Sequence, residues 1–95
     1  MDGDTVNESG FPTNISSSTL IRTGRGRLLG IFVASASASP TIKVWDNTSA
    51  ATTILVNTFT PIAATFYPMP FRFQTGCFVT ISGTVDCTVS LMPDL

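Results

Sequence analysis

A strict alternation of apolar and polar residues in the last quarter of the chain limits its fold more than any other feature. Between positions 85 and 91 every second residue is apolar: Val85, Cys87, Val89 and Leu91. Successive side chains of a β-strand point to opposite faces, so this segment predicts a strand with one buried face and one wet face. Cys77, Val79 and Ile81 alternate in the same way, and the short loop at 82–84 contains a glycine, which predicts a β-hairpin.

The two-residue period extends over most of the chain. Thr, Ser, Val, Ile and Phe dominate from residue 15 onward, and no segment sustains helical spacing for three turns. We expect eight short strands, at 15–22, 27–34, 41–46, 53–58, 63–67, 71–75, 77–82 and 85–91. Turn signals such as Ser39–Pro40, Pro68–Pro70 and Ser82–Gly83 separate them. The predicted fold is all-β: one antiparallel β-sandwich or jelly-roll-like domain over residues 14–95.

Residues 1–13 differ from the rest in composition. They hold three of the six acidic residues and are rich in glycine and polar side chains. This predicts a flexible N-terminal arm, in which Phe11 is the one large apolar residue and could anchor the arm on a neighbour. The arm lacks the basic and apolar regions of a signal peptide, and no stretch of the chain is long and apolar enough to span a bilayer. We therefore expect synthesis in a cytoplasm and no membrane partner.

The overall composition favours contact with other proteins. Hydrophobic residues make up 43% of the chain and charged residues only 12%, against about 25% charged in an average domain. A small domain has much surface for its volume, so we expect part of the apolar excess to be covered in an assembly. The alternative is a soluble sandwich coated with Thr and Ser. The net charge of −1 argues against nucleic acid as a partner.

The same strand patterns indicate which residues could form such contacts. Trp45 and Phe78 alternate with inward positions, as does one of the sets Leu28/Phe32 or Leu29/Ile31, unless the register is shifted by one residue. Three neighbouring arginines could hold an acidic patch of another protein, or could simply be solvated in a turn. The candidate protein-interface residues are Phe11, Arg22, Arg25, Arg27, Phe32, Trp45 and Phe78.

Groups suited to catalysis or metal binding are scarce. The chain has no histidine, which removes the commonest general base and the commonest metal ligand. Cys77 and Cys87 would lie diagonally across the expected hairpin, at about 7–8 Å, which is long for a disulfide. We expect two buried thiols that fill space in the core. No enzyme activity, metal or cofactor is predicted.

Four segments carry a resemblance to a known group of proteins: 26–33, 42–50, 71–79 and 86–91. Together they resemble small β-sandwich structural proteins of tailed phages. The resemblance implies a capsid decoration (cement) protein that binds the major capsid protein or another virion protein and is located in the virion. We also expect a symmetric homo-oligomer, a trimer ahead of a dimer. The alternatives are a tail or neck accessory protein, or a receptor- or carbohydrate-binding module of a tail fibre built around Trp45, Asp46 and Asn47.

Overall fold

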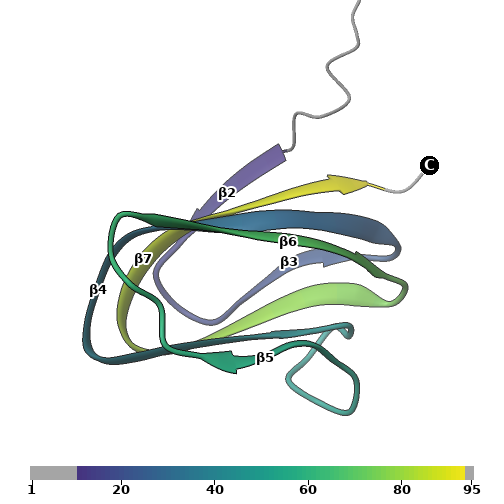
Figure 1. The fold of residues 1–95 in the computed structure, drawn as a ribbon. Helices are drawn as coiled ribbons and strands as arrows, with labels where there is room; N and C mark the ends of the chain where they lie inside the picture. Colours follow the sequence, from purple (N-terminus) through teal and green to yellow (C-terminus); the bar gives the residue numbers. More distant parts are fainter. Residues whose placement is uncertain (1–10, 94–95) are drawn as a thin grey trace, which may run out of the picture.

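The computed structural model describes residues 11–93, which form an all-β, antiparallel structure (Figure 1). Six strands make up this part of the chain: β2 (Phe11–Ile15), β3 (Thr19–Thr23), β4 (Gly26–Trp45), β5 (Ile54–Phe59), β6 (Thr65–Phe73) and β7 (Gly76–Pro93). All six belong to one sheet. The prediction of eight short strands is wrong for this region. β4, β6 and β7 each run continuously through two of the expected strands, and the expected strand 15–22 is divided between β2 and β3. No helix in residues 11–93 could cross a membrane.

The two long strands form the centre of the sheet. They pair along their whole length, from Gly26 opposite Pro93 to Trp45 opposite Phe78. The outer edge of β7 carries β2 and β3, and the outer edge of β4 carries β6 and β5. The sheet therefore has two halves that share the long strands. The β2/β6 half contains β2, β7, β4 and β6, and the β3/β5 half contains β3, β7, β4 and β5.

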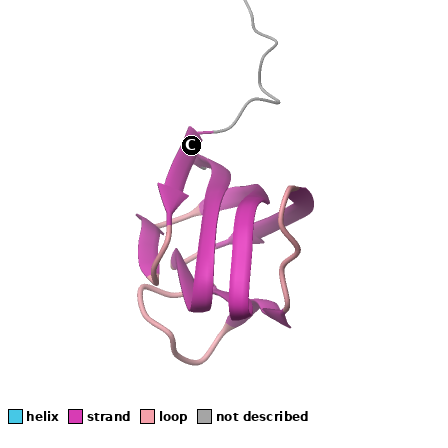
Figure 2. Ribbon diagram, turned by 90° about the vertical axis from the view of Figure 1, so that its left-hand side faces the viewer, coloured by secondary structure: helices cyan, strands magenta, loops and turns pink. Residues whose placement is uncertain are grey.

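A bend in both long strands folds the sheet so that its two halves face each other (Figures 1 and 2). In β4 the register with β7 shifts between Ser37 and Thr41, and Ala38 and Ser39 have φ values of 59° and 57°. In β7 the bend contains Gly83, whose φ is 77°. A Cβ atom at Gly83 would lie 2.5 Å from the carbonyl oxygen of Ala38, so only glycine fits without movement.

The bend explains why two turn signals were misinterpreted. Ser39–Pro40 and Ser82–Gly83 mark the bend inside continuous strands, not turns between separate strands. The predicted hairpin between 77–82 and 85–91 is therefore wrong. Both segments pair with β4, one on each side of the bend.

The core lies between the two halves, and both long strands, β4 and β7, contribute side chains to it. The most deeply buried side chains are Phe73, Leu28, Ile31, Ile42, Val33, Val44, Val79, Val85, Val89, Cys77 and Cys87. The alternation in 77–79 and 85–91 predicted its inward side chains correctly. Around residue 29 the prediction fails, because a β-bulge between Leu28 and Gly30 leaves both Leu28 and Ile31 inside. Neither of the two outward sets proposed for this segment is correct as a whole.

Two further expectations change at the edges of the sheet. The Pro68–Pro70 segment, predicted as a turn, lies inside β6. β6 pairs with β4 on one side, and proline is tolerated in edge strands because its missing N–H costs no ladder hydrogen bond there. Residues 11–13, predicted to belong to the arm, are the first residues of β2 and pair with β7. Residues 1–10 lie outside the described part of the chain.

Candidate protein interface

Four large apolar side chains line up across the outer face of the β3/β5 half. Leu20 pairs with Phe78, Phe78 pairs with Trp45, and Trp45 pairs with Ile54, so one side chain comes from each of four adjacent strands. Leu20 and Ile54 are 39% and 45% exposed, while Trp45 and Phe78 are half-buried. The chain neighbours Val44 and Val79 are fully buried, which places Trp45 and Phe78 on the opposite, outer face. We call these four residues the apolar row.

Trp45 is held in place by polar contacts of its neighbours. Its Nε1–H donates a hydrogen bond to Thr80 Oγ1 at 3.3 Å, and the Thr80 hydroxyl donates to the backbone oxygen of Lys43 at 3.1 Å. The Lys43 ammonium lies 4.3 Å from the centroid of the Trp45 ring, in cation–π contact. Because the indole is already fixed, the Trp45 side chain would lose little conformational entropy when another protein packs against the apolar row.

A smaller apolar patch occupies the outer face of the β2/β6 half. Phe32 of β4 pairs directly with Phe66 of β6, and the two rings are 43% and 53% exposed. The Phe66 ring covers Gly30, where an added Cβ atom would lie only 2.5 Å from the ring and 2.7 Å from the backbone oxygen of Tyr67. Each half of the folded sheet thus presents aromatic side chains on its outer face.

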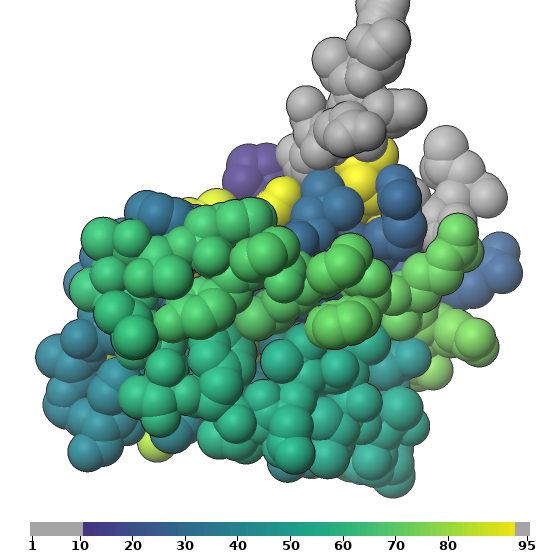
Figure 3. Space-filling model, in the orientation of Figure 1, coloured from purple at the N-terminus to yellow at the C-terminus, as the bar shows by residue number. Residues whose placement is uncertain are grey.

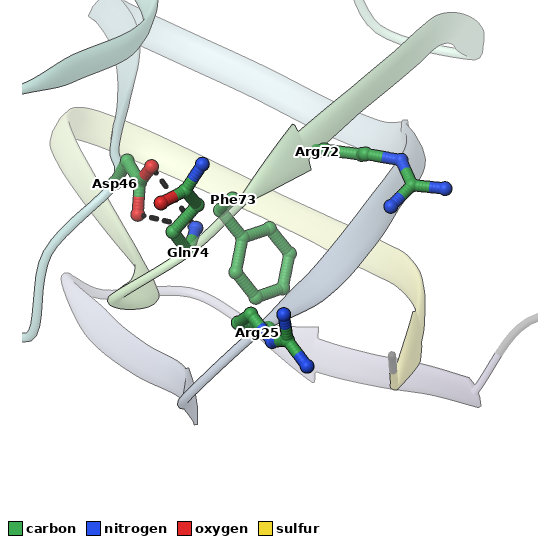
Figure 4. A pocket seen from close by; sticks show the side chains of 5 residues that line it. All are labelled: Arg25, Asp46, Arg72, Phe73 and Gln74. Carbon is green, nitrogen blue, oxygen red and sulfur yellow. Dashed lines mark hydrogen bonds between the residues drawn. The ribbon is translucent and has the colours of Figure 1, made fainter. Parts of the chain in front are cut away.

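One end of the molecule is rich in arginine. Arg25 lies in the turn between β3 and β4, and Arg27 pairs directly with Arg72 across β4 and β6. The Arg22 Nε–H donates to the backbone oxygen of Arg25 at 3.0 Å and braces the turn. A shallow cleft of about 220 Å³ opens here (Figure 4). It is lined by Arg25, Asp46, Arg72, Phe73 and Gln74.

The one acidic side chain of the cleft is fully engaged in holding the adjacent turn. The Asp46 carboxylate accepts hydrogen bonds from the backbone N–H groups of Gln74 at 3.0 Å, Thr75 at 2.8 Å and Gly76 at 3.4 Å. These are the residues that connect β6 to β7. Asp46 therefore anchors the β6–β7 turn to the end of β4, 28 residues away in sequence. Asn47, the next residue, instead bonds within its own loop, through Thr48 and Ala51.

The two cysteines are free and buried, as expected. Burial raises the pKa of Cys77 to about 12, with a smaller contribution from Asp46. Burial likewise raises the pKa of Cys87 to about 11, aided by Asp86. Since the thiolate is the nucleophile, neither group is activated near neutral pH. Residues 11–93 contain no group of three or more His, Cys, Asp or Glu side chains placed to hold a metal ion.

The structure brings some of the candidate interface residues together and separates others. Trp45 and Phe78 are cross-strand neighbours, whereas Phe32 lies on the outer face of the other half. Phe11 is 61% exposed in the edge strand β2. The three arginines of the candidate set gather at the arginine-rich end of the molecule.

Four residues of these surfaces were missed by the sequence analysis: Leu20, Ile54, Phe66 and Arg72. The first three were placed in predicted strands, but their faces were not assigned because their segments lack a clean alternation. Their importance comes from cross-strand pairing, and a single sequence does not contain the information about which strands are neighbours. Figure 3 shows the face of the molecule that β5 and β6 cover.

Comparison with models of protein families, with curated proteins and with solved structures found no match to this chain. The geometry of the described residues is therefore the basis for assigning a function.

Proposed function

We propose that this protein is a structural, non-catalytic subunit that binds another protein through the apolar row of Leu20, Phe78, Trp45 and Ile54. The observation that carries this proposal is the alignment of four large apolar side chains across four strands on one outer face. Single exposed apolar residues are normal, but a contiguous set with an aromatic centre is typical of protein interfaces. The fixed indole of Trp45 is suited to be the anchor of such a contact.

Within this class we propose a decoration protein of a phage capsid. The support comes from the sequence resemblance to small β-sandwich proteins of tailed phages, and we regard the folded sheet as a variant of that sandwich or jelly-roll architecture. A decoration subunit acts in many copies, so a modest apolar contact per copy is enough when the copies also contact one another. The second apolar patch, Phe32 with Phe66, would serve a homo-oligomeric contact of this kind.

A carbohydrate-binding role is less well supported by the contacts around Trp45. Sugar sites combine an open aromatic face with free polar groups beside it. Here Lys43 lies over the Trp45 ring, and the indole N–H is bonded to Thr80. The carboxylate of Asp46 is occupied by backbone N–H groups, and the Asn47 amide bonds to its own loop. The polar neighbours that a sugar would need are therefore already bound.

The copy number of the chain in purified virus particles tests the proposed role. A decoration protein should be present in hundreds of copies per particle, and quantitative mass spectrometry would measure this. A handful of copies would indicate a tail or neck component, and complete absence from particles would refute the virion role.

Substitutions in the apolar row test the proposed surface. Leu20→Lys or Ile54→Lys should weaken binding to undecorated particles at least about tenfold, since each places an unpaired charge in the contact, and a cost of about 1.4 kcal/mol is already a factor of ten. Thr58→Lys adds the same charge at an exposed position of the same strand β5 and is the matched control. Equal binding of Ile54→Lys and Thr58→Lys, both verified as folded, would show that the apolar row is not the docking surface.

A further inference from the structure

Four rows of side chains cross the outer face of the β2/β6 half. Along β7 every second side chain from Asp86 to Met92 lies on this face, because the residues between them are buried. The registers of β2, β4 and β6 show which of their residues share each row. The arginine row holds Arg27, Met92 and Arg72; the glycine row holds Pro12, Ser90, Gly30 and Pro68; the phenylalanine row holds Asn14, Thr88, Phe32 and Phe66; and the aspartate row holds Asp86 and Ser35.

The two middle rows differ in the size of their side chains. Phe32 and Phe66 are 43% and 53% exposed, so their rings project from the phenylalanine row. In the glycine row Gly30 has no side chain, and the Phe66 ring leans over it: a Cβ atom added at Gly30 would lie 2.5 Å from that ring. Pro68 is the cross-strand neighbour of Gly30. Another aromatic side chain can therefore pack over the glycine row, against the rings of Phe66 and Pro68.

The two ends of this face carry opposite charges. Arg27 and Asp86 are both exposed, and their rows lie about 20 Å apart along the strands. Within residues 11–93 Arg27 pairs with neither carboxylate, since Asp46 holds the β6–β7 turn and Asp86 bonds the Asn14 amide. Arg72 is engaged in an interaction of its own, and Asp94 lies outside the described residues. The charges that distinguish the two ends of the face are therefore those of Arg27 and Asp86.

A second copy, turned by 180°, matches this order of rows. We place the two-fold axis at right angles to the strands, between the glycine and phenylalanine rows. The arginine row of each copy then faces the aspartate row of the other, and the glycine row faces the phenylalanine row. Arg27 approaches the partner's Asp86, and Phe32 packs over the partner's Gly30 against the ring that covers it. Two sheets that stack about 10 Å apart, with their strands within about 30° of each other, allow these contacts.

The other two-fold arrangement of the same faces is unfavourable. An axis parallel to the strands would bring the two arginine rows together and the two aspartate rows together. Like charges would then meet at both ends of the contact, which opposes association. The order of the rows thus selects the arrangement in which the strands of the two copies run in opposite directions.

The size of the face sets the strength of such a contact. Four strands and four rows cover an area of about 20 Å by about 25 Å, or about 500 Å² on each copy. The total of about 1,000 Å² is at the lower limit for a specific interface. We therefore expect a weak dimer, with a dissociation constant in the micromolar range or above, that adds to the binding of many copies on one particle.

We propose that the outer face of the β2/β6 half binds a second copy of this chain in a two-fold dimer, in which Arg27 of each copy pairs with the partner's Asp86. This inference rests on the homo-oligomeric contact of the proposed function and states its symmetry and its residues. Guanidinium and carboxylate groups pair through directed hydrogen bonds, and the two-fold axis makes each contact occur twice. Such a contact closes with two copies, so it favours a dimer over the trimer expected from the sequence.

Sedimentation equilibrium of the purified chain tests the dimer. Between about 1 μM and about 1 mM protein we expect monomer and dimer in exchange. A chain that stays monomeric up to about 1 mM would overturn the proposal, and so would a trimer as the associated species.

Charge reversal in two separate variants tests the pairing. Arg27→Glu alone and Asp86→Lys alone each place like charges at both contacts and should weaken dimerisation at least about tenfold. In a one-to-one mixture of the two variants, opposite charges meet again at both contacts. The mixture should therefore form a heterodimer with an affinity within about threefold of that of the unmodified chain. A mixture as monomeric as either variant by itself would overturn the pairing.

Two matched controls complete the test. Arg25→Glu makes the same change of charge in the adjacent β3–β4 turn and should dimerise within about twofold of the unmodified chain. Phe32→Ala should weaken dimerisation at least about tenfold, whereas Phe11→Ala removes an exposed ring outside the four rows and should not. Equal losses within either pair of variants would overturn the proposal. None of these samples contains virus particles, so a failure here would refute the dimer and not the docking of the apolar row.

Discussion

Replacement of Asp46 by alanine tests the role of its carboxylate in anchoring the β6–β7 turn to the end of β4. The carboxylate accepts two short hydrogen bonds, from the backbone N–H groups of Gln74 at 3.0 Å and Thr75 at 2.8 Å, and a longer one from Gly76 at 3.4 Å. A hydrogen bond to a charged group contributes about 1.5–3 kcal/mol. Because Asp46 is half-buried, we take the low end for the two short bonds and expect a loss of about 3 kcal/mol.

Urea unfolding, followed by the fluorescence of Trp45, measures this loss. With a slope of about 1–1.5 kcal/mol per molar urea for a domain of this size, the midpoint should fall by about 2–3 M. Asp46→Asn keeps one acceptor oxygen and should lose about half as much stability.

Asp86→Ala is the matched control, because Asp86 is the only other carboxylate of residues 11–93 and is exposed. It accepts one hydrogen bond, from the Asn14 amide at 3.1 Å, and that amide also donates to the backbone oxygen of Cys87. Its removal should cost less than about 0.5 kcal/mol. If Asp46→Ala and Asp86→Ala shift the midpoint equally, the anchoring role of Asp46 is refuted.

Three further predictions concern the glycines and the cysteines. Gly30→Ala should destabilise the domain by about 1–3 kcal/mol in urea unfolding, because the new methyl group meets the Phe66 ring and a backbone oxygen; an unchanged midpoint would contradict the packing described here. Gly83→Ala should cost clearly more than Gly24→Ala, since both have positive φ but only Gly83 has backbone atoms within 3 Å of the added Cβ atom; equal losses would show that the bend is not sterically restricted. The raised pKa values of Cys77 and Cys87 favour the folded state fully below their ordinary pKa of 9.0, so stability should fall between about pH 9 and about pH 12, and a Cys77→Ala/Cys87→Ala variant should show a smaller fall over that range.

The sequence contained enough information to predict the class of fold and most of the core. The alternation around Val79 and Val89 is set by which face of a strand meets the core, and such a pattern is visible in a single chain. The outward positions of Trp45 and Phe78 followed from the same rule. The expected burial of both cysteines was also correct.

The arrangement of strands could not be predicted, because it depends on backbone conformations that share the same local signals. Gly83 with a positive φ serves a hairpin turn and a bend in a long strand equally well, and only pairing with β4 distinguishes them. The bulge at Leu29 shifts the inward and outward positions of the strand by one residue, and no residue type in this segment predicts a bulge. The apolar row and the Arg27–Arg72 pair were hidden for the same reason, since both arise from register between distant segments.

The position of β7 in the middle of the sheet has a consequence for the order of events during synthesis. β2 and β3 have no partner other than β7, and one whole edge of β4 stays unpaired until β7 is available. β7 is also the last of the described strands to leave the ribosome. The five described strands that precede β7 must therefore avoid aggregation until translation has passed Pro93. After that, the pairing of residues as far apart as Gly26 and Pro93 sets a slow folding rate.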